Sequence, residues 1–276
     1  MLLKKIIIIL APVTAALALL SCNTLLSSSQ TDFAPVTQEM SQAGIKTIYS
    51  ELGQAGGKVF TLDPKTSMVR IYAFRTGRAA KLGHNHVLSA PRFTGFFYLP
   101  PSGTSNSRFD LEFRLDQLEI NNPEYRSLLG SAFSSVLSHE AIEGTRDHML
   151  GEDNMQAEKF PFVRIHSLQV SGEFPKFAAK VQVDMHGQKR EMWVPLSVEG
   201  LPDRLSVAGS FVLRQTDFGA QPYSVLGGML AVQDEIVIEF KLLGTQEPLS
   251  LSIEKASGAK RATMEKSPDP SALRNQ

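Results

Sequence analysis

Two histidines, His84 and His86, stand one residue apart in the segment LGHNHVL. On a β-strand, residues i and i+2 project to the same side, so both imidazoles would face one ligand. Two imidazoles at this spacing are half of a zinc, copper or nickel site, and His148 is the first candidate for a third ligand. No second His-x-His motif and no His-x-x-x-His motif accompanies the pair.

The same pair has two other interpretations. A histidine that acts as a general base needs an orienting carboxylate and a nucleophile, and the chain has no Gly-x-Ser-x-Gly elbow. We therefore expect no enzymatic activity. The interpretation that we favour is structural or ligand-facing. The imidazoles of His84 and His86 either satisfy buried backbone groups at the barrel mouth or, together with Arg146, contact the polar head of a bound molecule.

The only cysteine of the chain, Cys22, follows an N-terminal segment that begins with Lys4 and Lys5 and continues with an apolar run over residues 6–20. A basic start, a short apolar stretch and a small residue before the cleavage point are typical of a secretory signal, here residues 1–21. The cysteine at this position resembles the lipobox of bacterial lipoproteins, in which it is acylated and anchors the mature chain to a membrane. An ordinary signal peptide with an incidental cysteine is the alternative.

Four regions follow from composition. After the signal, we expect a lipidated, flexible tether over residues 22–57, with a short helix near 38–52. We expect one folded domain over residues 58–244 and a disordered tail over the polar residues 245–276. Asn23 after the cysteine favours the outer membrane over the inner one, with the domain facing the periplasm. Without the two signal lysines the chain has 26 basic and 28 acidic residues, so we expect no nucleic-acid partner.

The elements that must position these residues are strands. In RFDLEFRL the apolar residues Phe109, Leu111 and Phe113 alternate with charged ones, which is typical of an antiparallel strand with one dry and one wet face. The segment KFAAKVQVDM repeats the pattern, and HGQKRE predicts a tight turn at Gly187 into a second strand. The pattern predicts an all-β fold of eight to ten strands, which is either a sandwich or a closed barrel.

One segment breaks the alternation. Tyr125, Leu128, Leu129, Phe133 and Leu137 have helical spacing, so we expect a helical insert over 123–137, with a second short turn near residues 149–150. Such an insert would be a plug or lid at one end of a barrel. An eight-stranded barrel is either filled by its own side chains or holds one ligand, and the sequence leaves both open.

An ordered series of motifs resembles the YceI-like family. The series runs from VFTLDPKTSMVRIYAF through FTGFF, GTRDHML, KFPFVRI and VQVDMHGQKREMWVPLSV to LRQTDFGAQ and DEIVIEFKLLG, and it covers about residues 59–244. The resemblance implies a lipocalin-like antiparallel β-barrel in a secreted or periplasmic protein. It also implies an apolar tunnel for a long isoprenoid chain and a link to quinones or to cytochrome b-type partners.

The chain departs from the family pattern where DPKTS, residues 63–67, lacks a histidine and where the GHNH segment appears. We nevertheless expect non-enzymatic binding or carriage of a polyisoprenoid or quinone-like lipid. A metal- or haem-interacting envelope protein and a filled barrel that recruits a partner by its outer surface are the alternatives. The residues expected to line the tunnel are Phe109, Leu111, Phe113, Val163, Ile165, Phe177, Val181, Val183, Ile236, Ile238 and Phe240.

Overall fold

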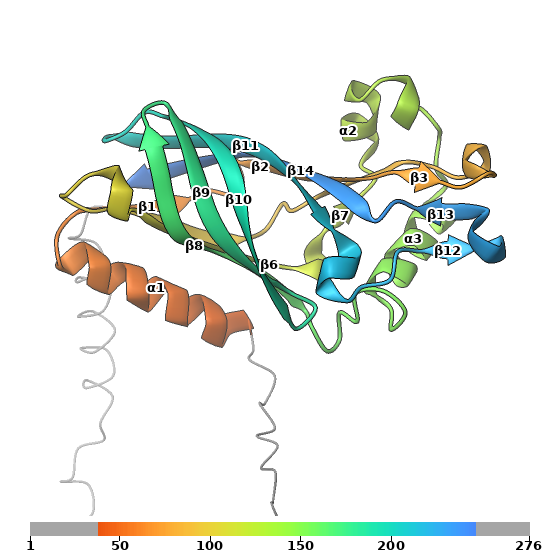
Figure 1. Ribbon diagram of the computed structural model, residues 1–276, viewed down its shortest axis with the longest axis horizontal. Helices are drawn as coiled ribbons and strands as arrows, with labels where there is room; N and C mark the ends of the chain where they lie inside the picture. The colour runs from red at the N-terminus through yellow and green to blue at the C-terminus, as the bar shows by residue number, and fades with distance from the viewer. Residues whose placement is uncertain (1–37, 247–276) are drawn as a thin grey trace, which may run out of the picture. The chain divides into compact units, whose positions relative to one another are not determined.

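Antiparallel strands are the main regular structure of residues 38–246, which are the part of the chain that the computed structural model describes (Figure 1). The predicted signal, Cys22 and most of the predicted C-terminal tail lie outside these residues. The strands are β1 (Lys58–Leu62), β2 (Met68–Ala73), β3 (Arg75–Thr76), β4 (His86–Ser89), β5 (Thr94–Leu99), β6 (Arg108–Arg114), β7 (Glu119–Ile120), β8 (Phe162–Glu173), β9 (Lys176–Met185), β10 (Gln188–Glu199), β11 (Arg204–Arg214), β12 (Ser224–Val225), β13 (Leu230–Val232) and β14 (Glu235–Gln246).

Within residues 38–246 the strands are accompanied by three α-helices and six short 3-10 turns. The α-helices are α1 (Gln38–Gln54), α2 (Pro123–Leu128) and α3 (His139–Leu150). The 3-10 turns are η1 (Ala80–Leu82), η2 (Thr104–Asn106), η3 (Leu115–Gln117), η4 (Ser131–Phe133), η5 (Gln215–Phe218) and η6 (Leu226–Gly228). Within the described residues no helix is long and apolar enough to cross a membrane.

The main sheet closes into an eight-stranded barrel. Its strands follow the order β1, β5, β6, β8, β9, β10, β11 and β14, and β14 pairs back onto β1, with Leu62 opposite Gly244. All the pairs are antiparallel. Closure leaves these strands without a free edge, which confirms the predicted barrel and excludes the sandwich.

Strand β14 is shared between two partners, and this lengthens the barrel at one end. Its last three residues, 244–246, pair with β1, whereas Val237–Lys241 pairs with β2. Strands β1 and β2 are therefore segments of one strand, interrupted at 63–67, where the Ser67 hydroxyl accepts a hydrogen bond from the Leu243 N–H at 2.9 Å. Strands β4 and β7 add to β2 in the same way, so β2, β4 and β7 carry the wall beyond β1 and β5.

In β9 the alternation of apolar and polar residues matches the alternation of buried and partly exposed side chains. Its inward residues Phe177, Ala179, Val181, Val183 and Met185 are buried and the residues between them are partly exposed. The turn into β10 consists of two residues, both with positive φ, as in the hairpin turns that match the twist of the strands. The predicted hairpin is confirmed.

The outer face of β6 differs from the solvated face that the alternation predicts. Glu112 is only 1% exposed and accepts a hydrogen bond from Arg164 Nε on β8 at 2.6 Å. Asp110 accepts a hydrogen bond from the Tyr49 hydroxyl of α1 at 2.8 Å. Charged residues therefore lie on a covered face here because a neighbouring strand and a helix supply partners for them.

The flexible tether predicted over 22–57 is too long. Residues 38–54 form α1, and its buried Tyr49 stacks on Phe96 of β5 with ring centroids 5.2 Å apart. The Tyr49–Asp110 hydrogen bond adds a polar attachment, and burial raises the pKa of the phenol. The helix predicted near 38–52 is thus present, but it belongs to the folded unit, because an aromatic side chain buries its surface against the barrel.

The helical insert is also divided differently from the prediction. Helix α2 ends at Leu128 and a second, longer helix, α3, begins at His139, where Ser138 caps the helix by accepting a hydrogen bond from the Ala141 N–H. The helix expected to run to Leu137 therefore stops early, and residues 149–150 end a twelve-residue helix rather than a short turn. Gly130, with φ of 73°, follows α2 and ends it in the left-handed region.

Candidate functional site

The interior of the barrel contains a cavity of about 970 Å³. This volume lies at the upper end of the range of small-molecule sites, roughly 300–1,000 Å³. It is roughly six times the 150 Å³ cavity that accepts one benzene, which corresponds to space for on the order of 30 to 40 carbon atoms. The barrel is therefore hollow, and the filled interior that the sequence left open is wrong.

Every residue expected to line a tunnel lines this cavity. The structure places Phe109, Leu111, Phe113, Val163, Ile165, Phe177, Val181, Val183, Ile236, Ile238 and Phe240 on its wall. On β14 the alternate residues from Ile236 to Leu242 all face it, and six residues of strand span about 20 Å. The cavity thus extends along the strands, a form suited to an elongated molecule.

Helix α3 covers one end of the cavity with a face of mostly small side chains. Ala141, Gly144, Thr145, His148 and Met149 line the cavity and follow the i, i+3, i+4, i+7, i+8 spacing of one helix face. A Cβ placed on Gly144 would have no atom within 4 Å, so space is open beside the helix. The lid predicted for the insert corresponds to α3 in position, while α2 contributes no lining residue.

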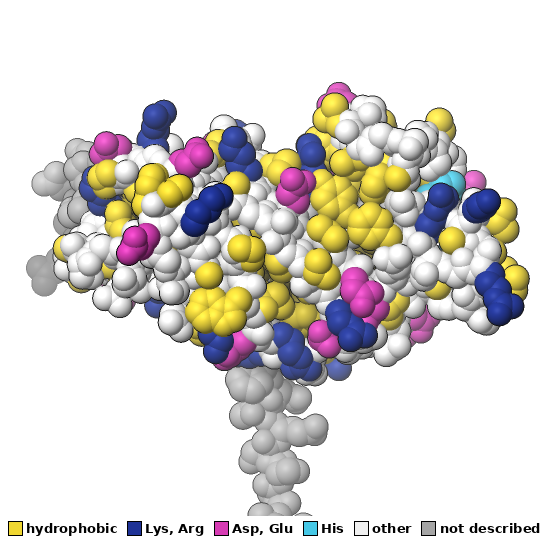
Figure 2. All heavy atoms as spheres, turned by 45° about the horizontal axis from the view of Figure 1, so that its top comes forward, with side chains coloured by type: hydrophobic (Ala, Val, Ile, Leu, Met, Phe, Trp, Pro, Cys, Tyr) yellow, Lys and Arg dark blue, Asp and Glu magenta, His cyan; other side chains and the backbone are white. Residues whose placement is uncertain are grey.

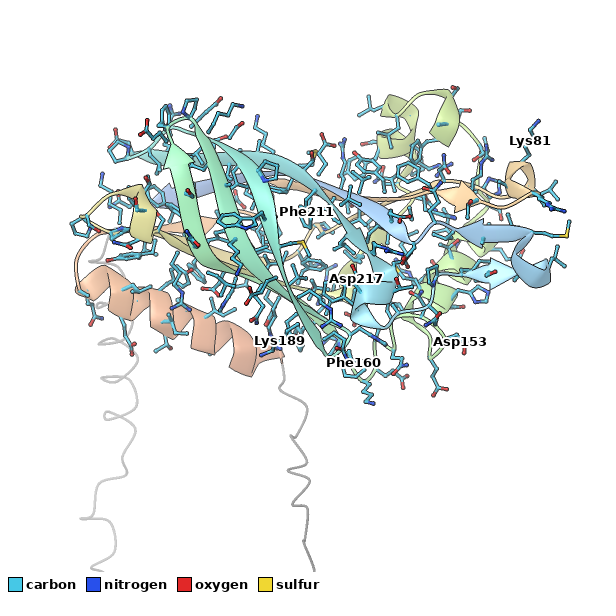
Figure 3. The ribbon with its side chains drawn as sticks, viewed as in Figure 1. Lys81, Asp153, Phe160, Lys189, Phe211 and Asp217 are labelled. Carbon is cyan, nitrogen blue, oxygen red and sulfur yellow. The ribbon has the colours of Figure 1, made fainter. Side chains whose placement is uncertain are left out.

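The cavity wall contains several polar side chains but few charged ones. Among the described residues, Asp153 is the only formally charged side chain that lines the cavity, and no lysine or arginine of this part of the chain does so. Asp153 lies beyond α3 (Figure 3), and several neutral polar residues lie near it in the sequence or on the 221–224 segment: Asn154, Gln221, Tyr223 and Ser224. An anionic group inside the barrel would therefore have no cation to pair with, which is costly at low dielectric.

One of the two histidines of the GHNH segment lines the cavity. His86 Nδ1 lies 2.9 Å from Asn121 Nδ2. The carbonyl oxygen of the same amide accepts hydrogen bonds from the Val87 N–H at 3.2 Å and from Arg126 Nη1 at 3.0 Å. These two donors fix the orientation of the Asn121 amide, so its NH₂ group donates to His86 Nδ1.

The surroundings of His86 determine both its charge and which ring nitrogen carries the proton. Burial, with the positive charge of Arg126 and the neighbouring His84, lowers the pKa of His86 from 6.5 to about 4. The ring is therefore neutral at pH 7. Because Nδ1 accepts a hydrogen bond, the single proton lies on Nε2, which makes no hydrogen bond within residues 43–246. His86 thus offers one N–H donor to the cavity.

Arg126 fixes this arrangement from the side away from the cavity. It is buried and donates to the Asn85 carbonyl at 2.7 Å, to the Ser135 carbonyl at 3.1 Å and to the Ser135 hydroxyl at 2.9 Å. With Asn121, all of these partners are neutral, so its charge is not cancelled by a carboxylate among them. That uncompensated charge is why the pKa values of both His84 and His86 are lowered, after burial.

The other residues named for polar contact lie elsewhere. His84 precedes β4 rather than lying on it, so the i, i+2 rule for strands does not apply, and its Nδ1 lies 3.0 Å from the Ser135 hydroxyl. Arg146 donates to the carbonyls of Asp116 and Leu118 and does not line the cavity. His148 lines the cavity from α3, with its ring 4.7 Å from that of Tyr223.

The structure does not assemble a metal site from these histidines. Within the described part of the chain no three His, Cys, Asp or Glu side chains are grouped so that they could hold a metal ion. His84, His86 and His148 are thus not brought together, because the first two are held by Ser135 and Asn121 and the third packs on Tyr223.

Comparison with known proteins places the fold in a family. The model of the YceI-like domain matches residues 60–243. The chain belongs to the YceI-like family. Members of this family are generally non-catalytic binding proteins and are thought to bind hydrophobic or isoprenoid ligands. A comparison with curated proteins gives no match.

Two solved structures are similar to this YceI-like protein. The crystal structure of BcnA from Burkholderia cenocepacia has 13% identity and a TM-score of 0.49, and the match covers 66% of this chain and 98% of BcnA. The crystal structure of a Campylobacter jejuni YceI protein has 9% identity and a TM-score of 0.42, with 58% of this chain and 84% of that chain covered.

Sequence reasoning missed part of the YceI-like cavity. Apart from His86 and His148, the α3 face and the lining residues of β2 and β4, such as Ile71 and Leu88, were not predicted, and neither were those of β10 and β11. The helical spacing of Ala141, Gly144 and His148 was a usable signal for α3. No local signal identified β2 and β4 as wall strands, because they reach the cavity only through pairing with β14.

Proposed function

We propose that this YceI-like barrel binds one neutral, elongated lipid in its cavity, a polyisoprenoid or quinone-like molecule, and carries it without chemical change. The observation that supports this best is the 970 Å³ carbon-lined cavity inside a closed barrel. Burial of apolar surface gains about 0.8 kcal/mol per methylene. Ten buried methylenes would contribute about 8 kcal/mol before the cost of ordering the chain, so contact with the wall is sufficient for binding.

The head group is proposed to be an uncharged hydrogen-bond acceptor, such as a quinone carbonyl. Within residues 43–246 no lysine or arginine lines the cavity, so a phosphate head would find no cation among these residues. The Nε2–H of His86 is a donor without a partner in the described structure, and a carbonyl oxygen is its natural complement.

The location of the protein in the cell is proposed from its sequence. The segment that ends at Cys22 supports a lipid anchor, and with it a place on a membrane of the cell envelope, facing the periplasm, with the outer membrane favoured by Asn23. The barrel would then hold its ligand close to a membrane that supplies or receives it. A cytochrome b-type or other envelope partner stays a prediction.

Native mass spectrometry of the chain, extracted in mild detergent without chelator, tests the binding. We expect an added mass of several hundred daltons that is lost on organic extraction. The variant Gly144→Trp, which projects an indole from the cavity face of α3, should reduce the occupied fraction at least fivefold. Gly44→Trp is the matched control, because Gly44 is also a helical glycine with open space around it, but lies on the exposed face of α1.

A second measurement separates the contribution of the ligand's head group to affinity from that of its isoprenoid tail. A quinone with an isoprenoid tail should bind at least tenfold more tightly than an isoprenyl phosphate of equal length, and His86→Phe should reduce quinone affinity about five- to tenfold, the value of one hydrogen bond. A chain that carries no ligand and takes up neither compound would refute the proposal. Tighter binding of the phosphate would refute only the neutral head.

A further inference from the structure

A small three-stranded sheet, β12–β13–β3, projects from the α3 end of the barrel and is separate from the main sheet (Figure 1). Two loops close its far end: residues 77–83, which contain η1, and residues 226–229, which contain η6. The Ala79 N–H donates to the Met229 carbonyl at 2.7 Å and holds the two loops together. We call these two loops the arm tip.

The arm tip exposes large aliphatic side chains. Leu82 is 76% exposed, Leu226 is 70% exposed and Met229 is 49% exposed. Leu226 also has φ of 53°, the left-handed region that a leucine rarely adopts. Backbone outliers cluster at functional sites, and exposed apolar patches mark surfaces that contact another body.

The charges of the arm tip have one sign. Arg78 and Lys81 are exposed beside the aliphatic residues, and neither residues 75–83 nor residues 224–233 contain an Asp or Glu. Neither Arg78 nor Lys81 forms a salt bridge within residues 43–246. Figure 2 shows basic and hydrophobic side chains side by side at this end of the molecule, and Figure 3 places Lys81 at its extremity.

The arm connects this surface to the cavity. Tyr223, Ser224 and Val225 line the cavity and lead directly into Leu226 of the arm tip, and Val232 lines it again just after the tip. A body bound to the arm tip would therefore stand next to the α3 end of the cavity, where the small side chains of α3 leave open space.

We propose that the arm tip inserts into the surface of a bilayer that contains anionic lipids, and that it thereby brings the α3 end of the cavity against the membrane. Aliphatic residues enter the boundary between head groups and acyl chains, while lysine or arginine near an anionic surface each contribute about 1 kcal/mol. A protein partner that fits this tip would need an acidic apolar pocket, whereas a bilayer offers both features everywhere. The proposal concerns the outer surface and holds whether or not the cavity binds a lipid.

Tryptophan fluorescence in vesicles tests the arm tip. Trp193, the only tryptophan, is 49% exposed on β10 of the barrel wall and serves as the internal comparison. The full chain is extracted in detergent and reconstituted into vesicles of phosphatidylethanolamine and phosphatidylglycerol, 3:1, with or without bromine on the acyl chains. In Leu82→Trp/Trp193→Phe we expect brominated lipids to quench the indole emission at least twofold, whereas the wild-type chain, which has only Trp193, should show little quenching.

Charge reversal is the second part of the test. Arg78→Glu/Lys81→Glu in the Leu82→Trp/Trp193→Phe background should lose more than half of the quenching, as should replacement of phosphatidylglycerol by phosphatidylcholine. Lys189→Glu/Arg190→Glu is the matched control, because both residues are exposed on the hairpin between β9 and β10. Absence of quenching at position 82 in anionic vesicles, equal quenching of Trp193, or equal effects of the two charge reversals would each overturn the proposal.

Discussion

Mild acid should destabilise this protein through His86. Its pKa is about 4 in the folded chain and 6.5 for a free side chain. Between these values the unfolded chain binds more protons than the folded chain, so the stability that neutral His86 contributes is complete above pH 6.5 and is lost as the pH falls towards 4. The full loss is about 3 kcal/mol, of which about 2 kcal/mol falls between pH 7 and pH 5.

The structural cause of this loss is a conflict between two donors. A protonated His86 carries a hydrogen on Nδ1, which then faces the NH₂ group of Asn121 at 2.9 Å. The Asn121 amide cannot rotate to accept that hydrogen, because its oxygen holds the Val87 N–H and Arg126. The charge of the imidazolium would also lie beside the buried guanidinium of Arg126.

Urea unfolding followed by Trp193 fluorescence at pH 7, 6 and 5 measures the effect. The wild type should lose about 2 kcal/mol more than His86→Gln over this range. The range stays above the pH at which Asp116 and Asp234 lose their contribution, since their pKa values are lowered in the fold. His84→Gln should leave most of the pH dependence in place. Equal losses in the wild type and in His86→Gln would refute the proposed neutral, Nε2-protonated state.

Three further predictions follow from the same contacts. Tyr49→Ala should cost about 3 to 5 kcal/mol or release α1, which amide hydrogen exchange of the helix would report as lost protection. Arg126→Met should cost about 2 to 4 kcal/mol by urea unfolding, because it leaves buried carbonyls unpaired, and it should raise the pKa of His86, measured by NMR titration. Cys22→Ser should move the chain from the membrane fraction to the soluble fraction, detected by immunoblot.

The sequence by itself determined the wall of the cavity to a large extent. In β6, β9, β14 and the first part of β8 the apolar residues recur with period two, so the side that each residue takes is a local property of an extended chain. For this reason all eleven residues expected to line a tunnel do line the cavity. The order of the motifs likewise indicated the family before any contact was known.

Only the tertiary structure decided that the barrel is hollow and what its chemistry is. The pairing of β14 with both β1 and β2 sets the extent of the wall, and it joins residues more than 150 positions apart. Burial and the charge of Arg126, 40 positions away, lower the pKa of His86, and the arm tip unites residues 77–83 with 226–229. Burial and charge depend on such distant neighbours, whereas alternation depends on adjacent ones, so the sequence showed which residues face inward but not what surrounds them.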